Sequence, residues 1–515
     1  MQRLVIALTA LLSLTGALVI GAYLAFFSAA TDRAAAFVPA DSVAYVNIYL
    51  EPSAGQRMNL ASVLGRFPGF GDAATLDDKI EEVAQRFLGD AGVDYRADIE
   101  PWLGGQIALA ISVAPDNAAG VPLVIAAVKD AAAAELALAD LSTRFGGAAA
   151  SETYAGVTLH TSEAGPTYAI VDDMAILGPS SAAVRSAIDA HAAGDGLAED
   201  PAFDDAMGSL PADHLASVYL NIERAAALGG TAADAVSGLS VATAALLAEP
   251  NGVQLVGSAP FDPAAAGNAA RASFGLLSEP SSLTDWMPAE TQASAVIFGL
   301  GDILASLEAT VGSTPEASGA LTQLRALAAL GLGIDLDADV LPLLDREVAV
   351  GLTGLSTEPS GVLVLRPSDP DAAAATLEGL ASSLESRGSQ RSDQESQGET
   401  ITTLSVPQIG SVSYVVAEGV VLLALSPDDV AAALAAHESG RTLAAKEAYR
   451  ATFDLAGARA GNELYVDVGS LLGPASDLAG LDAETRAILE PIRTFGLSAP
   501  ALEDRLQFNA MVTVE

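Results

Sequence analysis

The 515-residue sequence contains no cysteine, which excludes a disulfide-stabilised scaffold, a thiolate metal site and a cysteine nucleophile. Lysine and arginine are scarce: 24 of them stand against 65 aspartates and glutamates, giving a formal net charge of −41. Proteins that bind nucleic acid need clustered basic side chains to face the phosphates, so this composition excludes a nucleic-acid partner. The acidic residues are scattered, which favours a diffusely solvated, salt-adapted surface over a specific cation site.

Sequence motifs for catalysis or cofactor binding are also missing. No Gly-Lys pair is present for a phosphate-binding loop, and neither a Gly-x-Ser-x-Gly elbow nor a Ser-x-x-Lys nucleophile occurs. We therefore expect no cofactor and no enzymatic activity. A pair of catalytic carboxylates, which is assembled in space, remains open. With 51% hydrophobic residues the chain has the composition of a folded protein.

The N-terminal segment is the longest apolar run. From Leu4 to Ala29 it carries no charge, and as a helix it would extend roughly 39 Å, more than the hydrocarbon core of a bilayer. This predicts a signal-anchor transmembrane helix within residues 1–30. The alternative is a cleaved signal peptide ending at residues 28–30. Arg3 before the run predicts a single-pass plasma-membrane protein with a cytoplasmic N-terminus and an extracytoplasmic body.

The rest of the chain repeats itself. Residues 166–203 align without a gap on residues 412–449, and segments starting at 37 and 92 align on segments starting at 286 and 333. The alignment pairs Tyr168 with Tyr414, and its register continues to Tyr219 and Tyr465. It predicts two tandem homologous repeats, residues 37–277 and 286–515, joined by a linker over 278–285.

Hydrophobic periodicity indicates the fold class of each repeat. In 106–113 apolar residues alternate with small or polar ones, as in a half-buried strand, and 121–128 would complete a hairpin. A second hairpin is predicted to turn at Asp172-Asp173. Helical spacing is found over 131–145 and again from Val184 to His191. We expect an α+β fold with a mainly antiparallel sheet and helices packed on one face, and a surface loop over 385–399.

Two histidines occupy matching positions in the repeats. His191 and His437 each end an apolar helical stripe shortly before a glycine, Gly194 or Gly440. A histidine in the last turn of a helix can bond terminal carbonyls and interacts favourably with the helix dipole, which favours a structural role. The alternative is a general base or metal ligand, for which the sequence supplies no paired histidine and no neighbouring acidic ligand.

Four aspartates are the only metal-ligand candidates that the spacing suggests. Asp335 and Asp339 belong to a stretch that begins like a calcium-binding loop, but glycine and glutamate are missing at the sixth and twelfth positions. Asp94 and Asp98 are their counterparts in the first repeat. A helix N-cap at Asp98 and Asp339 is the plainer interpretation.

Four segments together resemble one known family. They are VPADSVAYVNIYLEPSAGQ, VDYRADIEPWLGGQIALAI, YAGVTL and AIVDDMAILGPSSAAVRSAIDA followed by GLAEDPAF. The chain is similar in these segments to the domain-of-unknown-function 3352 family of bacterial membrane-anchored envelope proteins. The resemblance implies an N-terminal anchor and an exported α+β body, and it supplies no catalytic residues.

These features lead to one functional hypothesis and two alternatives. The first is a non-catalytic, membrane-tethered protein that binds or scaffolds an envelope partner, using the crevice or flank of two similar halves. The second is a carrier of an apolar ligand such as lipid beneath a curved sheet. The third is an envelope hydrolase that uses carboxylates.

Overall fold

The computed structural model divides the chain into two compact units, residues 1–266 and 267–515. The predicted linker and repeat boundaries stay predictions. The structure describes residues 32–68, 93–114, 117–146, 149–162, 166–229, 238–266, 271, 274–278, 280–301, 304, 335–354, 359–407, 410–456, 460–479, 482–502 and 504–515. The expected transmembrane helix therefore lies outside the described residues. Within the described ranges, no helix is both long enough and apolar enough to cross a bilayer.

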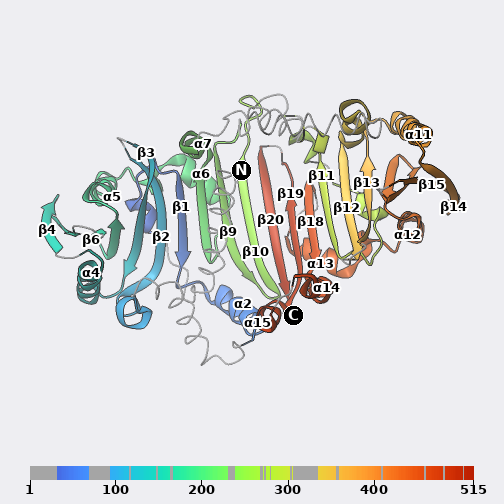
Figure 1. Cartoon of the computed structure of the whole chain (residues 1–515). Coiled ribbons are helices and arrows are strands. Elements are labelled where there is room, and N and C mark those ends of the chain that lie inside the picture. The colour runs from blue at the N-terminus through green and yellow to red at the C-terminus, as the bar shows by residue number, and fades with distance from the viewer. Residues whose placement is uncertain are drawn as a thin grey trace. The chain divides into compact units, whose positions relative to one another are not determined.

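Unit 1 is an antiparallel sheet with helices. Its described strands are β1 (Ala44–Tyr49), β2 (Leu103–Ala114), β3 (Asn117–Val128), β4 (Ala149–Tyr154), β5 (Val157–Ser162), β6 (Thr167–Val171), β7 (Met174–Gly178), β8 (Ala216–Asn221), β9 (Val241–Glu249) and β10 (Gly252–Pro260). They pair in the order β4-β5-β6-β7-β3-β2-β1-β8-β9-β10, and every one of these pairs is antiparallel (Figure 1).

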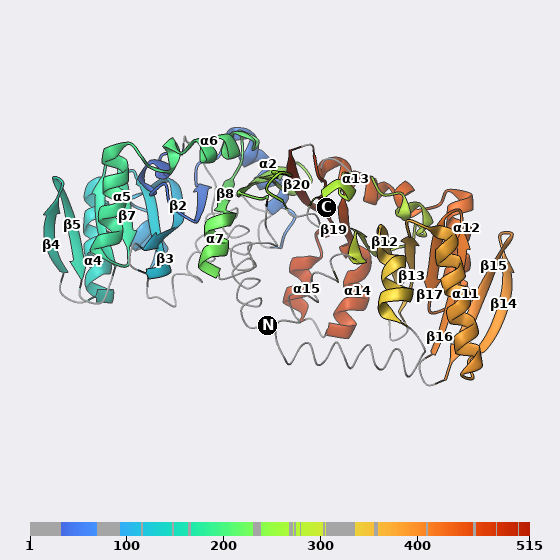
Figure 2. The same cartoon turned by 90° about the horizontal axis from the view of Figure 1, so that it is seen from above.

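The helices of unit 1 connect groups of these strands. They are α2 (Ala54–Leu64), α4 (Ala131–Gly146), α5 (Ser181–Ala193), α6 (Pro201–Gly208) and α7 (Ile222–Gly229), with the 3-10 helices η1 (Ala34–Phe37) and η5 (Leu197–Glu199) and the π-helix η4 (Tyr95–Ile99). Helices α4 and α5 (Figure 2) pack on opposite faces of the sheet, because α5 shares a core with Ile125 and Ile176, and α4 shares one with their neighbours Ala126 and Ala175. The expectation of helices on one face is therefore wrong. Leu60 and Leu64 of α2 likewise pack with Val46, while its neighbour Tyr45 belongs to the core on the other face.

The strands of unit 2 pair in the same order along the chain as those of unit 1. They are β11 (Ala293–Phe298), β12 (Glu347–Gly354), β13 (Ser360–Arg366), β14 (Gln390–Ser396), β15 (Glu399–Val406), β16 (Gly410–Ala417), β17 (Val420–Ala424), β18 (Asn462–Asp467), β19 (Ile492–Ala499) and β20 (Arg505–Val514). Their antiparallel order is β14-β15-β16-β17-β13-β12-β11-β18-β19-β20.

The helices of unit 2 fill corresponding places along the chain. They are α11 (Pro370–Ser386), α12 (Pro427–Ser439), α13 (Glu447–Ala456), α14 (Val468–Ala479) and α15 (Ala483–Leu489), with η7 (Leu283–Trp286), η9 (Leu336–Val340), η10 (Leu341–Leu344) and η11 (Leu443–Ala445). Helix α14 packs against β19. The described part of both units is thus α+β with antiparallel sheets, as the periodicity predicted.

Local signals account for several predicted elements. Strands β6 and β7 form the expected hairpin, and Asp172 and Asp173 have φ values of 48° and 60°, the left-handed pair that a tight two-residue turn needs. Helix α5 begins where the Ser180 side chain accepts a hydrogen bond from the Ala183 N–H, and it ends at Gly194 with φ 66°.

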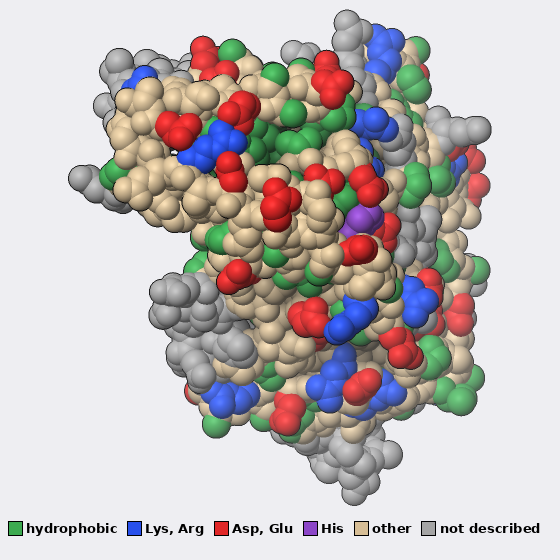
Figure 3. All heavy atoms as spheres, turned by 90° about the vertical axis from the view of Figure 1, so that its right-hand side faces the viewer, with side chains coloured by type: hydrophobic (Ala, Val, Ile, Leu, Met, Phe, Trp, Pro, Cys, Tyr) green, Lys and Arg blue, Asp and Glu red, His purple; other side chains and the backbone are tan. Residues whose placement is uncertain are grey.

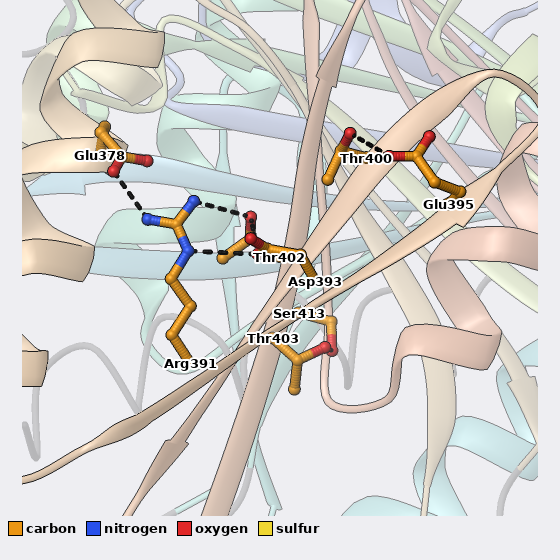
Figure 4. A network of polar contacts seen from close by, with 8 residues as sticks. All are labelled: Glu378, Arg391, Asp393, Glu395, Thr400, Thr402, Thr403 and Ser413. Carbon is orange, nitrogen blue, oxygen red and sulfur yellow. Dashed lines mark hydrogen bonds and ion pairs between the residues drawn. The ribbon is translucent and has the colours of Figure 1, made fainter.

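The surface loop predicted over 385–399 is wrong. Residues 390–396 form strand β14, which pairs with β15 along its whole length. Arg391 of β14 fastens this polar hairpin to α11, because Nη1 lies 2.7 Å from Glu378 Oε1 and Nε lies 3.1 Å from Asp393 Oδ1 (Figure 4). Hydrogen bonds from Arg391 and then from Thr402 lower the pKa of Asp393.

Candidate functional site

The two matching histidines each form a joint between a helix end, a hairpin turn and the segment before the first strand. In unit 2 the His437 ring stacks on Trp286 with centroids 3.6 Å apart and an interplanar angle of 9°. Its Nδ1 lies 3.0 Å from the carbonyl oxygen of Asp285. Because a carbonyl only accepts, Nδ1 carries a proton, and the other ring nitrogen, Nε2, is left for a second partner. Glu418 Oε2 lies 3.6 Å from that Nε2.

The joint of unit 1 has the same parts, but its histidine is bonded through the other ring nitrogen. His191 stacks on Phe37 with centroids 3.9 Å apart and an interplanar angle of 17°. Its Nε2 lies 3.0 Å from Asp172 Oδ2, so here Nε2 donates to the carboxylate. Both helices end next to their histidine at a left-handed glycine, as the sequence predicted. Sequence reasoning missed the acidic partners because they lie 19 residues upstream, on a turn that only folding brings close.

A shallow open pocket of about 450 Å³ adjoins the second joint. It is lined by Asp285, His437, Gly440, Thr442, Ala444 and Ala445. The His437 ring is held by its stack and by the carbonyl of Asp285, which is the geometry of a structural joint.

Replacing His437 separates the two contributions to the joint. His437→Phe keeps an aromatic ring against Trp286 and loses the hydrogen bond to Asp285, so we expect a loss of about 1 kcal/mol in the free energy of unfolding. His437→Ala loses the ring contact as well, worth about 0.5 to 1.5 kcal/mol more. Urea unfolding of both variants measures the difference. Equal losses would show that the stack contributes nothing.

The four candidate aspartates serve the backbone. Asp94 is the N-cap of η4, where its Oδ1 accepts from the Ala97 N–H at 2.8 Å. Asp98 Oδ2 in turn accepts from the Asp94 N–H at 2.9 Å. The N-cap expected at Asp98 is therefore wrong by four residues. That backbone hydrogen bond, followed by the bond from Arg144, lowers the pKa of Asp98.

Unit 2 uses its pair in the same way. Asp335 caps η9 by accepting from the N–H groups of Asp337 and Ala338, and Asp339 Oδ2 accepts from the Asp335 N–H at 2.8 Å. The cap expected at Asp339 is wrong for the same reason. Over the described ranges, no three His, Asp or Glu side chains lie together in a group that could hold a metal ion.

The four tyrosines of the alignment are all buried. Tyr168, Tyr219, Tyr414 and Tyr465 have relative exposures of 1%, 0%, 8% and 0%. Burial raises the pKa of Tyr168 to about 12 and that of Tyr465 further. Their rings belong to the packed interior of each unit.

The sheet of unit 2 exposes apolar side chains on the face away from the Tyr465 core. One row crosses five strands through directly paired residues: Val350, Ala295, Leu464, Leu497 and Ala510. A second row, two residues along each strand, consists of Leu352, Ala293, Val466, Phe495 and Val512. We call these ten residues the apolar face. Val350 and Leu464 are 39% and 36% exposed, and the other eight are only half-buried.

In strand β2 of unit 1, too, the larger apolar side chains lie on the more exposed face. The predicted alternation is confirmed, but the small side chains Ala108 and Ala110 enter the core, whereas Leu109 and Ile111 are 40% and 42% exposed. Period-two alternation divides a strand into two faces without saying which one the helices cover. The large residues therefore mark the less covered face, a signal present in the sequence.

Charged side chains form no single patch on the face of the molecule in Figure 3. Acidic residues are spread across it with lysine and arginine between them. This is the diffuse arrangement that the sequence favoured.

Comparisons with known proteins give a family and no activity. The family model described as "Protein of unknown function (DUF3352)" matches residues 4–513, which confirms the resemblance found in the sequence. No curated protein matches the chain. Crystal forms III, I and IV of a protein called TP0453 are similar at 12%, 13% and 12% identity. They match over 49%, 45% and 47% of this chain and 90%, 80% and 85% of TP0453, with TM-scores of 0.26, 0.26 and 0.25, which are too low to establish a common fold.

Proposed function

We propose that this chain, which belongs to the DUF3352 family of proteins of unknown function, is a membrane-tethered, extracytoplasmic and non-catalytic binding protein for lipid acyl chains. The observation that carries the proposal is the apolar face of unit 2. Ten apolar side chains in two adjacent rows, none of them fully buried, form a continuous surface. Continuous exposed apolar surfaces on soluble bodies mark binding sites.

The energetics of burial favour an apolar ligand on this surface. Fully burying a valine or leucine side chain is worth about 1.5 to 3 kcal/mol, and Val350 and Leu464, which are 39% and 36% exposed, have part of that still to gain. Ala293 and Ala295 lie between larger neighbours on both sides. We propose that an acyl chain would lie along these small residues of β11.

We further propose that the two units arose by duplication. The support is the shared order of strand pairing, the two histidine joints and the two reciprocally capped π-helices. In unit 1, helix α2 covers part of the corresponding face, where Leu60 and Leu64 pack with Leu246.

Lipid mass spectrometry of the full chain, purified in mild detergent, tests the proposal. Val350→Asn combined with Leu464→Asn removes the two most exposed residues of the face, and we expect co-purifying lipid to fall about tenfold or more, since each lost contact is worth at least 1.4 kcal/mol. The matched control is Leu425→Asn, because Leu425 is 62% exposed in the same unit and does not belong to the face. Equal lipid in wild type, double variant and control would refute the proposal, and unchanged thermal unfolding shows that the variants are folded.

A further inference from the structure

Asp32, the first residue that the structure describes, is bonded into unit 1. Its Oδ1 accepts hydrogen bonds from Tyr45 Oη at 2.7 Å and from Gln106 Nε2 at 2.7 Å. The same oxygen accepts from the backbone N–H groups of Ala34 and Ala35, at 3.1 and 3.2 Å. Tyr45 and Gln106 are 0% and 2% exposed, so the carboxylate is fixed by groups inside the unit.

The next residue adds two more attachments. The Arg33 N–H donates to Gln106 Oε1 at 3.2 Å, and Arg33 Nη2 donates to the carbonyl oxygen of Asp172 at 2.5 Å. Asp173, beside it in the same turn, accepts from the Val128 N–H at 2.8 Å. From Ala34 to Val38 the chain is largely buried. The chain is therefore bonded to unit 1 from Asp32 onward.

The length of chain before Asp32 is short. The run that predicts the span is taken to end at Ala29, so three Cα–Cα steps separate its end from Asp32, a reach of at most about 11 Å. The headgroup layer on each side of the hydrocarbon core is about 5 to 8 Å thick. A span that ends at Ala29 therefore leaves Asp32 only a few ångströms beyond the headgroups.

We infer that the Asp32 end of unit 1, with Arg33 and the Asp172-Asp173 turn, lies directly against lipid headgroups, without a stalk between bilayer and body. This rests on the proposed membrane tether. The partner of this surface is the bilayer to which the chain is anchored, and the connection is stiff because Asp32 and Arg33 are bonded to three separate strands or turns of the unit. Such a stiff connection holds unit 1 at a fixed distance from the bilayer.

A spin label at residue 129 tests the height. The chain has no cysteine, so Lys129→Cys gives a unique site, and Lys129 is exposed and follows Val128, which is bonded to the turn. The full chain is reconstituted into phosphatidylcholine vesicles that contain lipids with nickel-chelating headgroups. We expect strong paramagnetic relaxation of the label. A flexible Gly-Ser insertion of about 20 residues between Ala30 and Thr31, which adds about 25 Å of mean reach, should reduce it several-fold.

The outcomes separate the two proposals. If carbonate extraction leaves the chain in the vesicles and the relaxation is weak, or the insertion does not change it, the inference of a stalkless connection is wrong while the tether stands. If carbonate releases the chain, the tether itself fails. Retention together with strong, insertion-sensitive relaxation supports both.

Discussion

Asp32→Ala should lower the free energy of unfolding by about 3 to 5 kcal/mol, because several buried donors lose their acceptor at once. The Tyr45 hydroxyl, the Gln106 amide and two backbone N–H groups all bond to this carboxylate. Each donor left unsatisfied in the interior costs about 1 to 3 kcal/mol, and relaxation or entering water recovers part of the sum. Urea unfolding of the full chain in detergent, followed by tyrosine and tryptophan fluorescence, measures the loss.

Asp32→Asn is the matched control and carries a pH dependence of its own. The amide keeps an acceptor oxygen, so we expect a stability within about 1 kcal/mol of wild type. Burial raises the pKa of Asp32, although the bonds from Tyr45, Ala35, Gln106 and Ala34 oppose that rise. A raised pKa in the folded state means that wild-type stability falls as pH increases from the ordinary aspartate value through the raised one.

The Asn variant has no such group, so its stability relative to wild type should increase over that pH range and then level off. Two results would contradict this account of Asp32. One is an Asn variant as unstable as the Ala variant, and the other is an Asn variant whose stability relative to wild type stays constant or falls as pH rises.

Gly461→Ala should be the most damaging single-methyl change in unit 2. A Cβ at this position would lie 2.1 Å from the carbonyl oxygen of Ala499 and 2.9 Å from that of Leu277. Both atoms belong to the backbone; Ala499 is paired in β19, and the Leu277 carbonyl accepts from the Ala501 N–H, so moving either would break a backbone contact. With φ at 67° the alanine is also strained. We expect a loss of more than about 3 kcal/mol, or failure to fold.

Gly440→Ala isolates the strain from the clash. Gly440 has φ 69° and no atom within 4 Å of the position where Cβ would lie. An alanine there is destabilised only by its left-handed backbone conformation, which costs about 1 to 2 kcal/mol. Thermal unfolding of both variants provides the comparison. If Gly461→Ala lowered the unfolding temperature no more than Gly440→Ala, the close packing of Gly461 against β19 would be incorrect.

The features that the sequence predicted are those with local causes. The turn at Asp172-Asp173 and the helix ends at Gly194 and Gly440 depend on backbone conformations that only a few residue types adopt readily. The alternation of β2 likewise follows from strand geometry. These signals lie within a few residues of the structure that they specify.

Other features depend on partners far along the chain. Strand β14 has no apolar alternation, because it pairs on one side only with β15 and carries polar side chains on both faces. Asp32 is bonded to Gln106, 74 residues away, and its neighbours in the sequence do not indicate that its carboxylate accepts hydrogen bonds from inside the unit. The acidic partners of His191 and His437 were missed for the same reason.

Predicting the apolar face requires both local sequence signals and the positions of partners far along the chain. Leu464 and Val350 could be recognised as strand residues from their neighbours in sequence. Their alignment into one row depends on the register of β11 with β12 and β18, and their exposure depends on where the helices pack. Sequence reasoning kept an apolar ligand only as an alternative because it could not place the helices.

The most direct test of lipid binding is acyl-chain quenching at the face itself. A fluorophore attached to Leu464→Cys, in the full chain held in detergent micelles, is titrated with phospholipid brominated on its acyl chains, and the same label on Leu425→Cys is the control. We predict strong, saturable quenching at 464 and little at 425. Equal quenching at both positions, or none at 464, would contradict a lipid site on unit 2.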